Sequence, residues 1–295
     1  MSLSLAVDLI NFCAELNVNT VILIGGEPTI HPHFLEIVNY VKTLNLKCGV
    51  ITNGYRLSNK EFIKKSSDYG LDFINFSVKA VNQNEQRKIA PSCDFKNVIS
   101  AMVNINNTDI NCTYSAVLTE QMLEDLENLA YLLNKYTKKN FLNLNFCGYK
   151  FNKSQEKNKD IFSAKERIQK LIVKFDSASK IMEGRIMLFQ SLPLCWWPES
   201  FIEKLKLQQQ ITSVCHLFNH NGLVLDVDGS CLPCNLMYSH PIGKFGVDFF
   251  DKKSFEQFWT SKKIITLLKE LCRPPYDECV SCKKYNLCAG GCPIC

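Results

Sequence analysis

Residues 20–146 alternate between short apolar runs and helical patterns, and this rhythm constrains the fold more than any other feature. Strands that alternate with helices form βαβ units, in which the strands are parallel and the crossovers right-handed. The ligand site of such a sheet lies at the carboxyl ends of its strands. We therefore predict an α/β fold with its chemistry just after each strand. The strand-like runs are residues 20–24, 46–51, 73–78, 110–117 and 141–146.

The first predicted element is a helix over about residues 4–16, and no strand precedes it. Its apolar residues share one face, it carries Asp8, and it has no basic segment before it, so an amphipathic helix is favoured over a signal peptide. A βα repeat that begins on a helix looks as though its first strand is missing. No apolar run approaches the roughly 18 residues that a membrane span needs, and we expect a cytoplasmic protein.

The segment GGEPT, residues 25–29, follows the first predicted strand. Glycines after a strand usually indicate a phosphate cradle, but the carboxylate of Glu27 would repel a phosphate. Gly25 and Gly26 let the backbone approach a ligand, and Pro28 stiffens the exit. Exposed carbonyls beside a carboxylate suit an ammonium group instead. An ordinary βα turn is the alternative.

Fifteen cysteines and a formal charge of +5 limit the kinds of ligand and partner that this protein can have. The basic bias is too weak to indicate a nucleic acid partner. An odd number of cysteines without a secretion signal indicates metal or cluster ligation rather than disulfides. Those before residue 150 are scattered and read as small buried apolar residues. From Cys195 onward ten cysteines mark a second domain.

The tail carries Cys279-x2-Cys282-x5-Cys288-x3-Cys292. A CxxC pair lets two thiolates converge on one metal centre. Upstream lie Cys215, a hairpin with its turn at Asp228–Gly229, and then Cys231 and Cys234. Structural zinc is a rival occupant, and a thiol redox pair is another. Because thiolates far outnumber histidines, the spacing favours iron–sulfur clusters over zinc.

The whole tail resembles a SPASM domain, the auxiliary-cluster domain of radical S-adenosylmethionine enzymes. The family pattern is C-x(9–15)-G-x4-C followed by C-x2-C-x5-C-x3-C. It is matched by Cys215, Gly229, Cys234, Cys279, Cys282, Cys288 and Cys292. The resemblance implies two auxiliary [4Fe–4S] clusters.

The resemblance also implies how the ligands divide. The first cluster would take Cys215, Cys234 and Cys292, with Cys195 as the fourth ligand. The second would take Cys279, Cys282 and Cys288. Its usual last ligand would lie beyond the C-x3-C. Cys295 could substitute for it, the cluster could have an open site, or the C-terminus could be cut short. Cys231 and Cys272 lie off the pattern.

In the same family, a turn like GGEPT holds the methionyl end of S-adenosylmethionine, which implies cofactor contacts by Gly25, Gly26, Glu27 and Pro28. Thr52 and Asn53 resemble the next strand's turn. Ser77 and Arg87 resemble the pair that holds the cofactor carboxylate, although Lys79 stands where relatives often have an acid.

The family's C-x3-C-x2-C motif, which holds the radical-generating cluster, belongs after the first strand and ahead of the first helix. No such motif lies there. We therefore expect a partial radical SAM barrel that lacks its first strand, and a chain that cannot generate the radical alone. The expected division is a partial barrel over 1–150, a linker and surface helix over 151–194, and a SPASM domain with a β-hairpin and helix over 195–295.

The resemblance implies a peptide- or protein-modifying enzyme served by a reductant such as flavodoxin or ferredoxin. Sulfatase-maturating relatives carry an Asp after the cysteine equivalent to Cys234, where this chain has Asn235, which cannot act as a base. Ribosomal-peptide maturation, by crosslinking or epimerisation, is therefore favoured over sulfatase maturation. The alternative from another class is a non-catalytic iron–sulfur or zinc protein for electron transfer or partner binding.

Overall fold

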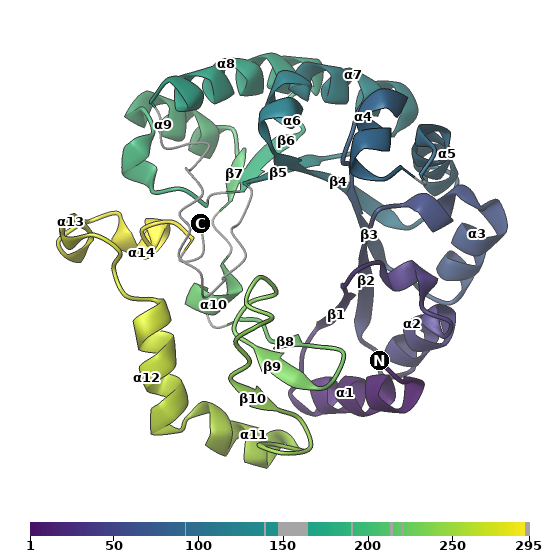
Figure 1. Ribbon diagram of the computed structural model, residues 1–295, viewed down its shortest axis with the longest axis vertical. Coiled ribbons are helices and arrows are strands. Elements are labelled where there is room, and N and C mark those ends of the chain that lie inside the picture. Colours follow the sequence, from purple (N-terminus) through teal and green to yellow (C-terminus); the bar gives the residue numbers. More distant parts are fainter. Residues whose placement is uncertain are drawn as a thin grey trace.

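The computed structural model describes residues 1–91, 93–138, 140–146, 165–189, 191–212, 215–219 and 221–292. Within these residues the main element is a seven-stranded parallel sheet whose strands follow one another in chain order. The first and last strands are its two edges, so the sheet is an open arc (Figure 1). The strands are β1 (Thr20–Leu23), β2 (Lys47–Thr52), β3 (Phe73–Ser77), β4 (Asn111–Leu118), β5 (Leu142–Phe146), β6 (Ile186–Phe189) and β7 (Ile211–Thr212). The predicted α/β fold with a partial (β/α) barrel is confirmed.

The connecting helices line the outer side of this arc (Figure 1). Several begin on a side-chain cap that the βα turn supplies: Asn59 accepts from the Phe62 N–H and Thr119 from the Met122 N–H. The helices are α1 (Leu3–Glu15), α2 (Phe34–Thr43), α3 (Lys60–Asp68), α4 (Gln83–Ile89), α5 (Phe95–Ile105), α6 (Glu120–Glu124), α7 (Leu126–Tyr136), α8 (Lys165–Ile181) and α9 (Glu199–Leu207).

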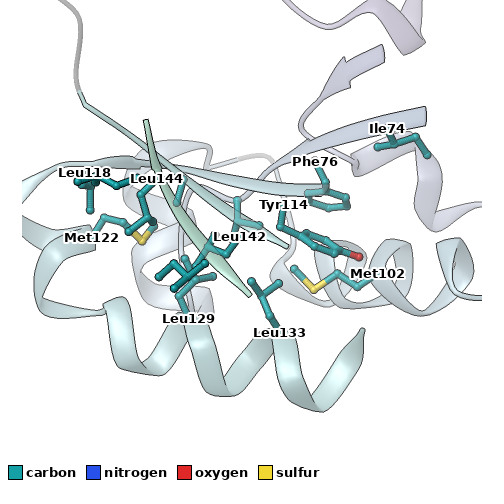
Figure 2. Packing of buried hydrophobic residues seen from close by; sticks show 14 of the residues in the cluster. Ile74, Phe76, Met102, Tyr114, Leu118, Met122, Leu129, Leu133, Leu142 and Leu144 are labelled. Atoms are coloured by element: carbon teal, nitrogen blue, oxygen red, sulfur yellow. The ribbon is translucent and has the colours of Figure 1, made fainter. Parts of the chain in front are cut away.

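The main core lies between the sheet and these helices. Figure 2 shows Phe76, Tyr114 and Leu144 on the strands packed toward Met102 and Leu129 on the helices, and all five are fully buried. Burying each such side chain contributes about 1.5–3 kcal/mol. Because side chains alternate along a strand, the residues between these core positions face the concave side of the arc.

The expected linker and surface helix over 151–194 is wrong for the residues that the structure describes there. Leu171, Phe175 and Ala178 of α8 are fully buried, and α8 packs against α7. The next strand, β6, pairs with β5 in parallel, with Leu142 opposite Ile186. The sheet domain therefore extends through Thr212. The linker prediction was based on the lysine-rich stretch and overlooked the apolar stripe of the helix that follows it.

The tail contains the predicted hairpin, in which β8 (Val224–Leu225) pairs antiparallel with β9 (Ser230–Leu232), and β10 (Gly243–Lys244) extends this sheet. Short helices surround it: α10 (His216–Asn219), α11 (Lys252–Trp259), α12 (Lys262–Leu271), α13 (Asp277–Val280) and α14 (Tyr285–Cys288).

Helix α1 joins the two parts of the molecule. Its Ala6 and Ile10 belong to the main core, whereas Phe12 belongs to the core of the tail. The Phe12 ring centroid lies 5.3 Å from that of Phe245 and 5.3 Å from that of Phe249. The small sheet accordingly lies beside α1 in Figure 1. Over the described part of the chain, every helix is too short or too polar to cross a bilayer.

Candidate functional site

The carboxylate of Glu27 ties together the turns that follow β1 and β2. Its Oε1 accepts hydrogen bonds from Thr29 Oγ1 (2.6 Å), the Thr29 N–H (3.2 Å) and Thr52 Oγ1 (2.6 Å). Its Oε2 accepts from the Asn53 N–H at 2.8 Å. Thr29 and Thr52 are buried. The acid of GGEPT therefore connects the turns after β1 and β2 at the edge of the sheet, and it directly follows the glycine pair in the sequence.

The glycines in front of Glu27 face open space. A Cβ built on Gly25 or Gly26 would meet no atom within 4 Å, and both residues are exposed. Behind them the second turn is tightly fixed: Thr52 Oγ1 accepts from the Gly54 N–H at 3.0 Å. Arg56 braces the first turn by donating to the Thr29 carbonyl. The result is an accessible backbone on a rigid, negatively charged support.

The predicted pair of Ser77 and Arg87 lies further along the same edge. Ser77 is half-buried at the end of β3 and pairs with Ser115 of β4. Arg87 is exposed in the last turn of α4. Hydrogen bonds from Lys96 lower the pKa of the Asp94 carboxyl, and the Arg87 charge adds to that shift. A role for Ser77 and Arg87 in holding a carboxylate stays a prediction, and so do cofactor contacts by Gly25, Gly26, Glu27, Pro28, Thr52 and Asn53.

A row of polar residues lies on the concave face of the sheet, and its members Asn75 and Asn143 were not anticipated from the sequence. Asn75 pairs with Thr113 and Ser115 with Asn143 in neighbouring strands. Asn75 Oδ1 is buried and has no hydrogen-bond partner among the described residues. The sequence signal is Asn75, which with Ser77 is one of two polar residues inside the apolar run FINFSV. An unpaired buried carbonyl beside a hydroxyl-bearing strand is equipped to accept a hydrogen bond from a ligand.

The segment after β6 receives the C-terminal cysteines. The Leu194 N–H donates to Cys288 Sγ at 3.2 Å, and the Cys292 N–H donates to the Ser191 carbonyl at 2.8 Å. Gly291 has φ +93°, and a Cβ there would lie 2.9 Å from the Ser191 oxygen. Only glycine allows this close approach. Cys288 and Cys292 are thus fixed at the carboxyl edge of the sheet, the edge that carries GGEPT.

Three thiols line a cavity of about 250 Å³ between this segment and α12: Cys215, Cys272 and Cys292. Cys234 belongs with them. Burial raises the pKa of its thiol, and the neighbouring Cys292 and Cys215 raise it further. The pKa of the Cys272 thiol is likewise raised by burial and then by Cys215. We call these four residues the first cysteine group: Cys215, Cys234, Cys272 and Cys292.

Four other cysteines of the tail lie near the hydrogen bond between Leu194 and Cys288: Cys195, Cys279, Cys282 and Cys288 itself. Burial raises the pKa of the Cys195 thiol, and the charges of Cys288, then Cys279 and Cys282, raise it further. The 3-10 turn that holds Cys195 runs from Leu194 to Trp196. We call this the second cysteine group: Cys195, Cys279, Cys282 and Cys288.

This placement differs from the ligand division that the resemblance implies, and that division stays a prediction. Cys195 lies with the second group and not with Cys215, Cys234 and Cys292, whereas the off-pattern Cys272 lies with the first. Cys231 is fully buried in the tail core. Cys295 lies outside the described residues.

The spacing C-x3-C-x2-C does occur once in the tail, at Cys288, Cys292 and Cys295, which the sequence reading overlooked. The structure divides Cys288 and Cys292 between the two groups. Among the described residues, no three His, Cys, Asp or Glu side chains are close enough to hold a single metal ion. A four-iron cluster spreads its thiolates more widely than one ion does, so this spacing is compatible with clusters.

Part of the sheet domain is similar in sequence to known proteins. Residues 1–133 match the radical SAM superfamily. The chain is 35% identical over 81 residues to the probable GTP 3',8-cyclase of Thermococcus kodakarensis, which is 28% of this chain and 26% of that protein. The matched segments span between 15% and 29% of the length of the first three curated relatives.

The fold is similar over nearly the whole chain to solved structures. The structure described as native anSMEcpe with bound AdoMet has a TM-score of 0.70 and 17% identity, covering 99% of this chain and 80% of that one. Streptococcus suis SuiB bound to the precursor peptide SuiA has a TM-score of 0.64 and 15% identity, covering 97% and 64%. At these identities the likeness establishes the fold, including the tail.

Proposed function

We propose that this chain is part of a radical SAM enzyme of the SPASM type that modifies a peptide or protein. One observation carries the proposal: the Glu27 network and members of both cysteine groups lie at the carboxyl edge of the same parallel sheet. Glu27 follows β1, Cys195 follows β6 and Cys215 follows β7. In parallel α/β folds this edge is where ligands bind.

We propose that S-adenosylmethionine binds at this edge beside the turn that follows β1. The ammonium of its methionyl end would lie on the exposed backbone of Gly25 and Gly26, with the Glu27 carboxylate behind them as a fixed negative charge. Thr52 and Asn53 hold that carboxylate in place by donating to it. Asn75 Oδ1, which is buried without a partner in the described structure, is a further acceptor for the bound cofactor. Together with a reduced cluster, S-adenosylmethionine supplies hydrogen-atom abstraction.

At the other end of the edge, the SPASM tail over residues 195–295 would hold auxiliary [4Fe–4S] clusters. The donor set fits, because every member of both groups is a thiolate donor, and thiolates are the usual ligands of such clusters. Burial is the main cause that raises the pKa of the Cys234 thiol, and the backbone N–H groups of Leu236 and Asn235 offset part of that rise.

A peptide is the proposed substrate. SuiB is a structural neighbour solved with a precursor peptide, and a further anSMEcpe structure holds a peptide named Kp18Cys. In this chain the Cys234 thiol donates to Asn235 Oδ1 at 3.3 Å. An amide there supplies no general base, so we propose ribosomal-peptide crosslinking or epimerisation rather than sulfatase maturation. The reductant would be a flavodoxin or ferredoxin, in the cytoplasm.

Cofactor binding tests the proposal. The anaerobically reconstituted chain should bind S-adenosylmethionine saturably in isothermal titration calorimetry. Glu27→Gln places an amide N–H against the donors of Thr52 or Asn53, so affinity should fall at least about tenfold, or 1.4 kcal/mol. Glu61→Gln, on an exposed carboxylate of α3, is the control and should bind normally. Equal affinity in wild type and Glu27→Gln, or no binding at all, would contradict the proposed cofactor seat.

A further inference from the structure

The family pattern leaves each auxiliary cluster one ligand short in this chain, and the structure supplies the missing thiol in both cases. We propose that the first and second cysteine groups each hold one [4Fe–4S] cluster through four thiolates, with Cys272 and Cys195 as the respective fourth ligands. This inference rests on the proposed function only in taking iron–sulfur clusters as the occupants.

Cys272 is placed for this role by the end of α12. It is the C-terminal cap of that helix, and its thiol lines the cavity that Cys215 and Cys292 also line. Tyr285 fixes the position, because its hydroxyl donates to the Cys272 carbonyl at 3.0 Å. Three segments of the chain therefore bring cysteines to one cavity, and Cys234 follows β9 two residues after its end.

Cys195 is placed by the turn after β6. The adjacent Leu194 N–H donates to Cys288 Sγ, so the Cys195 residue begins directly beside a member of the second group. A second contact secures the same surface: Lys284, just before α14, lies 2.5 Å from the Glu199 carboxylate on α9. The cysteine-bearing turn is thus held at both of its ends against the C-x2-C-x5-C segment.

The number of protein thiolates decides whether an iron of the cluster can bind an external ligand. A cluster with four protein thiolates has no iron open to an external ligand, whereas one with three presents an open iron. The N–H···S bond from Leu194 to Cys288 is the kind of contact that tunes the potential of a cluster. We infer that neither auxiliary cluster coordinates the peptide directly, and that the peptide contacts protein atoms only.

The test removes one cluster at a time. A background variant with Cys279→Ala and Cys282→Ala should lose the second cluster and keep about four irons and four sulfides per chain. In that background Cys272→Ala should expose one iron of the remaining cluster, which is released on mild oxidation to give the EPR signal of a [3Fe–4S] cluster. Cys195→Ala in the same background should leave the remaining cluster unchanged.

The mirror experiment uses a background with Cys215→Ala and Cys234→Ala, in which Cys195→Ala should produce the [3Fe–4S] signal and Cys272→Ala should not. Cys231→Ala, three residues from Cys234 and buried in the tail core, is the matched control and should keep both clusters. Circular dichroism separates ligand loss from misfolding, and Cys→Ser forms of both residues repeat the test with a similar volume.

Two results would overturn the assignment. One is the reverse pattern, in which Cys195→Ala damages the cluster of the first group. The other is a colourless protein that contains zinc in place of iron and sulfide. The reverse pattern contradicts the ligand assignment alone, whereas zinc in place of iron and sulfide also contradicts the auxiliary clusters of the proposed function. The titration with S-adenosylmethionine tests the cofactor site separately from both.

Discussion

Thr52 Oγ1 donates a 2.6 Å hydrogen bond to the carboxylate of Glu27 and accepts one of 3.0 Å from the Gly54 N–H. One hydroxyl therefore holds two consecutive βα turns in register. Because Thr52 is only 2% exposed, water cannot replace it in either hydrogen bond.

Replacing Thr52 by Val keeps the shape but leaves a buried carboxylate oxygen and a buried N–H without this partner. We expect Thr52→Val to lower the free energy of unfolding by about 1–3 kcal/mol, as measured by urea denaturation. The comparison variant is Thr43→Val, whose exposed hydroxyl donates to a carbonyl in the same helix, and its effect should stay below about 0.5 kcal/mol. Equal effects of the two variants would show that the Glu27 network adds no stability.

Gly54 combines a left-handed backbone with a lack of space. Its φ is +76°, and a Cβ there would lie 2.1 Å from the Phe76 ring. Gly54→Ala should therefore cost about 1–2 kcal/mol for the backbone conformation and about 1–3 kcal/mol more for overpacking. Gly246→Ala shares the conformation, with φ +80°, but its Cβ would meet nothing within 4 Å. Thermal unfolding of both variants separates the two costs, and matching Tm shifts would mean that Phe76 simply moves aside.

Phe12 carries the aromatic contact between α1 and the tail. Its ring is 2% exposed and lies 5.4 Å from that of Phe255. We expect Phe12→Ala to cost about 3–5 kcal/mol and to make the tail open before the sheet domain does. Limited proteolysis should then release fragments cut within residues 221–292, whereas Phe250→Ala, with its ring 65% exposed, should stay resistant. A single cooperative transition in Phe12→Ala would contradict this.

Asp228, in the hairpin turn before Cys231, makes a pH-dependent contribution to the free energy of unfolding. Hydrogen bonds from the Ser230 backbone and side chain, and then from Lys244, lower the pKa of its carboxyl to about 2. The unfolded value is about 3.9, so the ionised form favours the folded state. This stability is present above about pH 4 and is lost as the pH falls toward 2.

Asp228→Asn should therefore flatten the acid limb of the stability curve in that window, as followed by unfolding at a series of pH values. Asp109→Asn, on an exposed loop carboxylate, is the comparison and should leave the limb in place. An NMR titration that gives Asp228 an ordinary pKa would contradict the argument directly.

The strands of the sheet were predictable because each is a short apolar run between turn residues. The predicted run 73–78 became Phe73–Ser77, and 141–146 became Leu142–Phe146. The prediction stopped too early because Ile186–Phe189 follows a polar, lysine-rich stretch, and because β7 is only two residues long. A strand that short has no periodicity to detect.

The site was less predictable than the sheet. Spacing along the chain identified the thiols of the tail, but which thiols meet depends on the fold of the segments after β6 and α12. Cys195 and Cys272 are 77 residues apart. Their positions in the sequence do not indicate which of the other thiols each one lies beside. For Glu27, sequence reasoning anticipated the negative charge but not the two hydroxyls that hold it.

The sharing of α1 between two cores sets a rule for protein engineering. Chimeras of related enzymes are usually joined at the boundary where the sequence changes character, which here is near residue 195. A cysteine-rich segment grafted at that point would meet a foreign first helix in place of the one that carries Phe12. Exchanges that move residues 3–15 together with the C-terminal segment keep the Phe12 packing but replace the Ala6 and Ile10 contacts with the sheet domain, so they need matched partners for those two residues.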